Sequence, residues 1–132
     1  MKIGSTQIGF GAPPYVIAEL GVNHDGSVER ALSMVDQAAE SGADAIKLQL
    51  FRAEMLMSRA SQLAAYQSSA GERDPVEMLR RLELPLDALA AIRRRAHERN
   101  LHAIVTVFSV ELVAEAQRIG WDAYKTASPD II

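Results

Sequence analysis

Two segments of this chain follow one pattern, Gly-x-Asp-Ala-x-Lys, at residues 42–47 and at residues 120–125. Each follows an apolar helical periodicity and opens a short apolar run, which predicts equivalent strands in a repeating strand–helix architecture. Each copy also places a lysine at the third position of a strand whose pattern indicates burial. A long cation is costly to bury unless it faces a polar cavity or pairs with an anion, so Lys47 and Lys125 are candidate site residues. A lysine that reaches solvent from a strand edge is the alternative.

Composition and charge exclude several classes of function. The chain has 132 residues, of which 48% are hydrophobic and 23% are charged, as expected of a globular domain with one core. A net charge of −3 favours no nucleic-acid partner, and the one basic run, residues 93–95, lies in a helical pattern that predicts a solvated helix face. The absence of cysteine excludes a disulfide framework and a thiolate metal site. No apolar run has the length of a membrane span or signal peptide, so we expect no membrane partner and a cytoplasmic protein.

Strand and helix patterns alternate along the chain. The expected elements are, in order, an N-terminal hairpin within residues 1–14, a strand at 15–20, a helix at 27–41, a strand at 45–51, a long loop or lid at 52–73, helices at 74–84 and 86–99, a strand at 103–108, a helix at 109–119 and a strand at 123–128. Ser27 and Ser109 are the expected N-caps of two helices, and Gly42 and Gly120 are expected helix stops.

This order of elements predicts an α/β fold, because strands separated by helices pair in parallel through right-handed crossovers. Polar residues fall near the carboxyl ends of three expected strands, namely Glu19, Lys47 with Gln49, and Thr106. A (β/α)8 barrel and a doubly wound open sheet both place their active sites at those ends, so the pattern is compatible with either. Four strands cannot close an eight-stranded barrel, so we expect either a longer polypeptide or two copies that complete one another as a homo-oligomer.

Four motifs occur in one order: Val-Ile-Ala-Glu-Leu-Gly-Val-Asn-His-Asp-Gly at 16–26, Gly-Ala-Asp-Ala-Ile-Lys-Leu-Gln at 42–49, Glu-Met-Leu-Arg-Arg-Leu-Glu-Leu at 77–84 and Ala-Tyr-Lys-Thr-Ala-Ser at 123–128. In this order they closely resemble the opening of the N-acetylneuraminate (sialic acid) synthase family. The resemblance covers nearly the whole chain from Tyr15 on. It implies a (β/α)8 TIM-barrel fold, of which residues 1–132 supply the N-terminal half with its first four βα units.

The resemblance also implies an activity. Enzymes of this family condense phosphoenolpyruvate with an N-acylated aldose, N-acetylmannosamine or a related sugar, to a 2-keto-3-deoxy nonulosonic acid, and they release phosphate. They are transferases that form a carbon–carbon bond, and they use a divalent metal, Mn²⁺ or Mg²⁺. The family's metal-binding histidines lie in the later half of the barrel. No metal ligand is therefore expected in this chain, and the 132 residues alone are expected to be inactive.

Carried over by position, the resemblance implies roles for individual residues. Those expected to hold or line the phosphoenolpyruvate site are Lys47, Gln49, Thr106, Lys125 and Ser128. Their cations, hydroxyls and amide suit a ligand with a phosphate and a carboxylate. Glu19 is the expected catalytic residue, which would orient the sugar or a metal-bound water. Asn23, His24 and Tyr66 are expected on the sugar side; a local hydrogen-bonded turn at 23–26 and lid packing by Tyr66 are the alternatives.

Two motifs depart from the family pattern. Residues 106–109 read Thr-Val-Phe-Ser where the family usually reads Thr-Pro-Phe-Asp, so Ser109 replaces the aspartate. Residues 128–130 read Ser-Pro-Asp where the family usually reads Ser-Gly-Asp, so Pro129 replaces the glycine. Proline removes a backbone N–H and restricts the turn after Ser128. Two alternatives stay open beside a sialic acid synthase: a non-catalytic half-barrel that binds phosphorylated ligands, and another phosphoenolpyruvate-dependent aldose synthase. His97 and His102 have no matching partner and are expected to be structural or solvent-facing.

Overall fold

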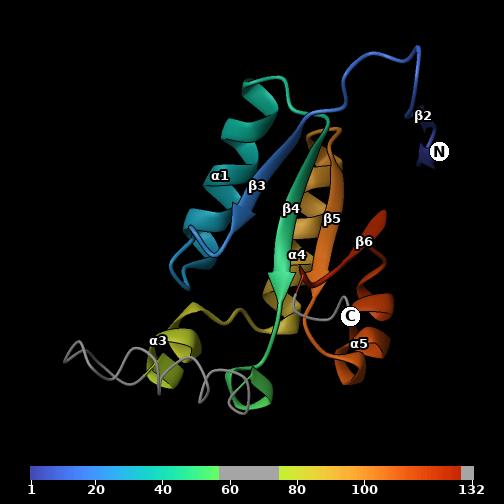
Figure 1. Ribbon diagram of the computed structural model, residues 1–132. Coiled ribbons are helices and arrows are strands. Elements are labelled where there is room, and N and C mark those ends of the chain that lie inside the picture. The colour runs from blue at the N-terminus through green and yellow to red at the C-terminus, as the bar shows by residue number, and fades with distance from the viewer. Residues whose placement is uncertain (57–74, 129–132) are drawn as a thin grey trace, which may run out of the picture.

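A four-stranded parallel sheet forms the centre of the protein (Figure 1). The computed structural model describes residues 1–56 and 75–128. The strands lie side by side in chain order and are β3 (Ile17–Gly21), β4 (Ala45–Leu50), β5 (His102–Val107) and β6 (Ala123–Thr126). All three pairings are parallel, which confirms the predicted α/β fold.

Helices α1 (Val28–Glu40), α4 (Leu86–Glu98) and α5 (Val113–Ile119) pack on one side of this sheet, and the 3₁₀ turn η2 (Val110–Leu112) precedes α5. Helix α3 (Pro75–Leu82) lies beyond the carboxyl end of β4. Helices α1 and α4 cover what we call the helix face, whereas Figure 1 looks onto the opposite side, which we call the front face. Strands β1 (Lys2–Ile3) and β2 (Thr6–Gln7) form a separate antiparallel hairpin. Among the described helices, none combines the length and the apolar character needed to cross a bilayer.

Helix boundaries test the capping predictions directly. Ser27 caps α1, because its hydroxyl accepts a hydrogen bond from the Arg30 N–H at 3.1 Å, and Gly120 ends α5 with φ at 79°. Ser109 also lies at the predicted N-cap position, that of η2, which leads directly into α5. Its hydroxyl makes no capping hydrogen bond, however, and donates to the sulfur of Met55 at 3.4 Å.

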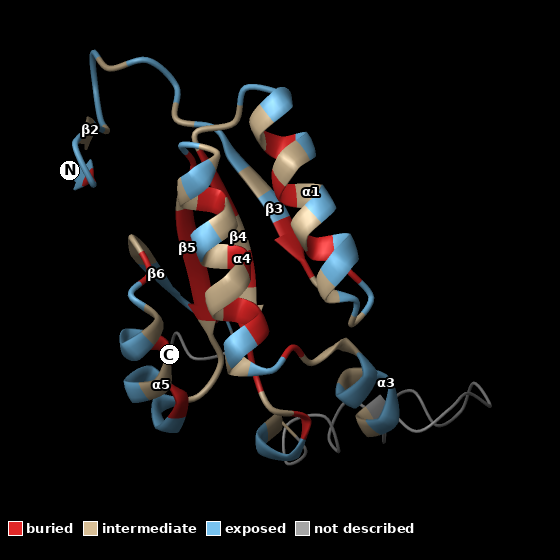
Figure 2. Ribbon diagram, turned by 180° about the vertical axis from the view of Figure 1, so that it is seen from behind, coloured by how far each residue is buried: buried red, intermediate tan, exposed pale blue. Residues whose placement is uncertain are grey.

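The deepest burial lies along β4. Ile46, Leu48 and Leu50 point to the helix face, are 0–1% exposed, and form one apolar cluster with Val35 of α1 and Ile92 of α4 (Figure 2). Each fully buried side chain of this size contributes about 1.5–3 kcal/mol of hydrophobic stabilisation. Since side chains alternate along a strand, their burial directs the residues between them to the front face.

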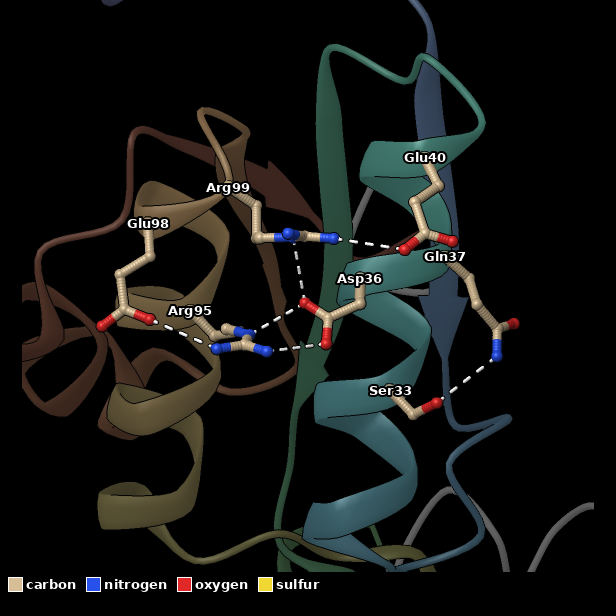
Figure 3. A network of polar contacts seen from close by, with 7 residues as sticks. All are labelled: Ser33, Asp36, Gln37, Glu40, Arg95, Glu98 and Arg99. Atoms are coloured by element: carbon tan, nitrogen blue, oxygen red, sulfur yellow. Dashed lines mark hydrogen bonds and ion pairs between the residues drawn. The ribbon is translucent and has the colours of Figure 1, made fainter.

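A polar network fastens α1 to α4 on the outer side of this cluster (Figure 3). The Arg95 guanidinium donates two hydrogen bonds of 2.8 Å to the Asp36 carboxylate, and Arg99 pairs with both Asp36 and Glu40. The hydrogen bonds from Arg95 lower the pKa of Asp36 despite partial desolvation. Arg93 donates instead to the Gly120 carbonyl at 3.1 Å, so members of the basic run at 93–95 join helices to their neighbours.

The front face is apolar at the amino ends of the strands. Ile3 of the hairpin packs there against Ala45 and Ile104. Tyr15 packs against this cluster, its hydroxyl lies 2.6 Å from His102 Nδ1, and the two rings stack. His102 therefore has a structural contact, in agreement with its expected role.

The aspartates of the two repeat copies make identical connections. The Asp44 N–H donates to the Val16 carbonyl at 2.8 Å, and the Asp44 carboxylate accepts the Val16 N–H at 2.7 Å. The Asp122 N–H likewise donates to the Ala103 carbonyl at 2.9 Å, and its carboxylate accepts the Ala103 N–H at 2.7 Å. In each copy the aspartate thus binds both backbone groups of one residue near the start of the preceding strand.

The carboxylate of Asp122 has a second partner. The same oxygen lies 2.7 Å from His97 Nε2 on α4, so His97 is also structural, as expected. Burial opposes ionisation of Asp122, but the hydrogen bonds from the Ala103 N–H and from His97 outweigh it, and the pKa of this carboxyl is lowered.

The repeat copies are offset in register. Lys47 lies beside Ile104, and Ile104 lies beside Ala123, whereas the equivalent of Lys47 in the second copy is Lys125. Equivalent residues are therefore displaced by two positions over two strand-to-strand steps. This offset equals a mean stagger of one residue for each step from strand to strand.

Gly26 shows how tightly the loop after β3 is packed. Its φ is 74°, and a Cβ added there would lie 2.1 Å from the carbonyl oxygen of Arg81. Gly42 has a similar φ of 79°, but an added Cβ would meet nothing within 4 Å. The two glycines thus share the same backbone strain on substitution and differ in steric clash.

We expect Gly42→Ala to lower the free energy of unfolding by about 1–2 kcal/mol, the usual cost of a left-handed alanine. Gly26→Ala should cost at least about 1–3 kcal/mol more, because the loop and α3 must also move apart. Urea denaturation of both variants measures the difference. Equal losses of stability in the two variants would show that the loop does not pack against Arg81 as described.

Candidate functional site

Three of the sequence-predicted residues form a row across the front face. Gln49 of β4 lies beside Thr106 of β5, and Thr106 lies beside Lys125 of β6. The row crosses the strands near their carboxyl ends, where parallel pairing gathers side chains from different parts of the chain. It combines an amide, a hydroxyl and a cation, all of which can donate to an anion.

Lys47 and Glu19 form an ion pair on the amino-end side of this row. They are register partners in β4 and β3, and the Lys47 ammonium contacts the Glu19 carboxylate. The Lys47 side chain is 20% exposed and that of Glu19 is 47% exposed, so Glu19 is the more accessible member. Sequence patterns placed both residues near the carboxyl ends of strands, but only the register reveals that one neutralises the other.

Because Gly21 has no side chain, it leaves space for the Glu19 carboxylate. Its φ is 50°, and a Cβ added there would lie 3.3 Å from Glu19 Oε1 and 3.6 Å from Gln49 Nε2. A side chain at this position would therefore crowd the Glu19 carboxylate and would lie in ordinary van der Waals contact with Gln49. The bulge that shifts the register of β3 between Glu19 and Gly21 lies at the same place.

Lys125 and Ser128 are also close. The Lys125 ammonium donates to the Thr126 carbonyl at 3.1 Å and lies 3.4 Å from the Ser128 hydroxyl. Both side chains are exposed, whereas Thr106 beside them is only 4% exposed. The row therefore runs from a buried hydroxyl to an accessible cation with a second hydroxyl beside it.

The residues expected on the sugar side have different settings. Asn23 is exposed in the turn that follows β3. His24 is 2% exposed, and its Nδ1 accepts a hydrogen bond from the Gly26 N–H at 3.1 Å. The local hydrogen-bonded turn at 23–26 is thus present, and the sugar role of His24 stays a prediction. Tyr66 and most of the expected lid fall within residues 57–74, outside the described residues.

His24 carries its proton on Nε2, because Nδ1 is used as an acceptor. Burial lowers the pKa of this imidazole, and a backbone hydrogen bond with Gly21 and the charge of Asp25 only partly offset that effect. His24 is therefore a neutral side chain that holds the turn beside the site.

The loop after β4 is held by residues that the sequence patterns did not single out. Glu83 accepts a hydrogen bond from the Ala53 N–H, and Arg52 lies between Glu83 and Glu115 at 3.8 and 3.9 Å. These charges come from segments that are distant in sequence. No local motif marks such a cluster, so only the fold could reveal it.

A metal centre is not formed by the described residues. Within residues 1–56 and 75–128, no group of three or more His, Asp or Glu side chains is placed to hold a metal ion. The Glu19 carboxylate, which lies beside the front-face row, already pairs with Lys47. The donor set therefore fits an organic anion and does not by itself fit a divalent cation.

We expect His24→Asn to flatten the pH dependence of stability. In the native protein the lowered pKa gives a contribution that is present above about pH 6.5 and is lost as the pH falls toward the folded-state pKa, because the unfolded histidine binds the proton first. Asparagine keeps an acceptor for the Gly26 N–H but does not titrate. Urea denaturation at pH 7.5 and 5.5 compares the two proteins. An equal loss of stability in both would show that His24 is not buried as the neutral form.

Comparisons with known proteins identify close relatives. The spore coat polysaccharide biosynthesis protein SpsE of Bacillus subtilis is 30% identical over 131 residues, which cover 98% of this chain and 35% of that protein. An N,N'-diacetyllegionaminic acid synthase of Campylobacter jejuni is 34% identical over 118 residues, which cover 88% of this chain and 35% of that protein. The chain thus spans 35% of the length of each of these curated relatives.

A solved structure and a family model give the same result. The N-acetylneuraminic acid (sialic acid) synthetase of Leptospira borgpetersenii serovar Hardjo-bovis, solved with citrate, matches with a TM-score of 0.80 at 29% identity, over 99% of this chain and 42% of that one. The model of the NeuB family matches residues 34–132. The order of motifs, the parallel sheet and this match together place the chain in the NeuB family, the family of sialic acid synthases that its motifs resemble.

Proposed function

We propose that this chain is the N-terminal half of the catalytic barrel of a nonulosonic acid synthase. The complete protein would condense phosphoenolpyruvate with an N-acylated aldose and release phosphate. The observation that carries the proposal is the row of Gln49, Thr106 and Lys125 on the front face, with Ser128 beside it. The names of the relatives, which include a legionaminic acid synthase and a sialic acid synthetase, support the product class.

The register offset supports closure of the sheet into a barrel. A (β/α)8 barrel has a shear of 8, which is a mean stagger of one residue for each of eight strands. The two repeat copies are displaced by two residues over two strand steps, which is the same rate. Equivalent residues then lie at the same height along the barrel axis. Lys47 and Lys125 would therefore lie in the same layer of side chains in the barrel interior.

The row suits the charged end of phosphoenolpyruvate. This substrate carries a phosphate and a carboxylate, which need fixed cations and hydrogen-bond donors in a site shielded from water. Lys125 and Ser128 offer the accessible cation and hydroxyl, and Thr106 and Gln49 continue the donors into the interior. We assign the phosphate and carboxylate to this row together with Lys47.

Bond formation in the proposed reaction joins C3 of phosphoenolpyruvate to the aldehyde carbon of the open-chain sugar. Water adds at C2, and the bond from C2 to the phosphate oxygen then breaks to release phosphate. The divalent metal that the family resemblance implies would polarise the aldehyde, and we place its ligands elsewhere in the complete protein, since the described donors do not fit it.

Glu19 is assigned to the sugar side of this reaction. A carboxylate beside a substrate with several negative charges is repelled unless a cation intervenes. Lys47 supplies such a cation here, because its ammonium contacts the Glu19 carboxylate. Glu19 can therefore hold a sugar hydroxyl or a reacting water while Lys47 shields it from phosphoenolpyruvate.

We expect Lys47→Met and Lys125→Met to weaken phosphoenolpyruvate binding in the complete protein by at least about 2 kcal/mol each, since a charge-assisted partner is lost while the aliphatic stem stays. Lys47→Met should cost more, because it also leaves Glu19 unpaired. Titration calorimetry measures the dissociation constants. Lys2→Met on the exposed hairpin is the matched control and should bind normally. Unchanged affinity in both site variants would remove the assignment.

We expect Glu19→Gln to lower kcat by roughly 10²-fold or more, the usual scale for a group that transfers or orients a proton, and to leave phosphoenolpyruvate binding nearly intact. Glutamine keeps the size and an acceptor oxygen for Lys47. Glu98→Gln on the exposed side of α4 serves as the control. Steady-state kinetics decide the matter: lost phosphoenolpyruvate affinity with a normal kcat would place Glu19 on the other substrate.

A further inference from the structure

The repeat pairs each lysine with an aspartate three residues earlier. Both aspartates bind the two backbone groups of one residue in the neighbouring strand segment, Val16 for Asp44 and Ala103 for Asp122. We propose that Asp44 and Asp122 are positioning residues that hold Lys47 and Lys125 in place on the front face. The proposal rests on the anion-binding role assigned to these lysines above, and it gives the aspartates no contact with substrate.

Each aspartate is attached to one residue of the neighbouring segment by two hydrogen bonds. A single hydrogen bond lets a strand pivot about it or slip past it, whereas bonds to both the N–H and the carbonyl of one residue fix position and direction together. The distances, 2.7–2.9 Å in both copies, are those of well-formed hydrogen bonds. Each strand therefore begins from a defined point on its neighbour.

Strand geometry carries this fixed point to the lysine. Each aspartate lies one residue before its strand begins, and three residues of extended chain span about 10 Å. A slip of one residue would move every side chain of the strand to the other face. The aspartate thus sets both the face and the height of the lysine.

The registers of β4 and β6 depend on their aspartates to different degrees. In β4, Ile46, Leu48 and Leu50 are buried on the helix face and resist a slip by themselves. In β6, Tyr124 is 48% exposed on that face, where its hydroxyl makes one long hydrogen bond of 3.5 Å to the Ala116 carbonyl, and Thr126 is exposed. Fewer buried side chains therefore oppose a slip of β6 along β5 than oppose a slip of β4. Asp122 should therefore matter more for Lys125 than Asp44 does for Lys47.

The Asp122 carboxylate has one more hydrogen-bond partner than the Asp44 carboxylate. The Asp122 Oδ2 accepts from the Ala103 N–H and contacts His97 of α4, both at 2.7 Å. Among the described hydrogen bonds and ion pairs, the Asp44 carboxylate has only its contact with the Val16 N–H. The extra partner lies on the copy whose strand is otherwise less constrained.

Variants of Asp122 separate positioning from simple stability. Asp122→Ala removes the acceptor, whereas Asp122→Asn keeps an oxygen for the Ala103 N–H and removes the charge. Asp36→Ala is the control, because it breaks the ion pairs between α1 and α4 without touching either repeat. All three are compared in the complete protein, at a temperature where each is folded.

Two readouts are measured. We expect Asp122→Ala to raise the dissociation constant of phosphoenolpyruvate roughly 10- to 100-fold, the scale for a site group misplaced by about 1 Å. Asp122→Asn and Asp36→Ala should stay within about threefold of the parent, and Asp44→Ala should fall between these variants. Backbone amide exchange of residues 123–126 should accelerate about tenfold in Asp122→Ala and not in Asp122→Asn.

The outcomes distinguish this inference from the proposed function. If Lys125→Met loses phosphoenolpyruvate affinity while Asp122→Ala behaves like Asp36→Ala in both readouts, the positioning role is overturned and the site assignment stands. If neither Lys125→Met nor Asp122→Ala changes affinity, the site assignment itself fails. Amide exchange then still decides whether Asp122 holds β6, and unchanged exchange of residues 123–126 in Asp122→Ala overturns that claim as well.

Discussion

Burial of Ile46, Leu48 and Leu50 under α1 and α4 is the constraint on which the candidate site depends. These three side chains are essentially inaccessible to solvent, and together they contribute several kilocalories per mole of hydrophobic stabilisation. Turning β4 over would expose all of them at once. Lys47 and Gln49 therefore have only the front face to occupy, and the polarity of the site follows from apolar packing on the other side of the same strand.

The front face itself is divided by function along the strands. At the amino ends Ile3, Ala45 and Ile104 form a small apolar cluster, and at the carboxyl ends the row of Gln49, Thr106 and Lys125 is polar. Each strand thus supplies structure at one end and ligand-binding groups at the other. A parallel sheet makes this division possible, because it brings all carboxyl ends to the same edge.

Local sequence patterns predicted the features that depend on residues near one another in the sequence, such as strand alternation and helix ends. Alternation placed Lys47 and Gln49 on one face, and Ser27 and Gly120 bounded helices as their types require. Ser109 lies at the predicted N-cap position, but its hydroxyl makes no capping hydrogen bond because it donates to Met55, a partner brought near only by folding. The contact of Glu19 with Lys47 depends on the register of two strands, which no local pattern reveals. Asp44 and Asp122 were overlooked because an aspartate after Gly-x is also an ordinary turn residue.

A crystal structure of the complete protein with phosphoenolpyruvate bound tests the central claim most directly. The account predicts the phosphate or carboxylate within hydrogen-bond distance of Lys125 and Thr106, with Lys47 between the ligand and Glu19. Phosphoenolpyruvate bound away from the carboxyl ends of β4–β6, with these side chains unengaged, would contradict it.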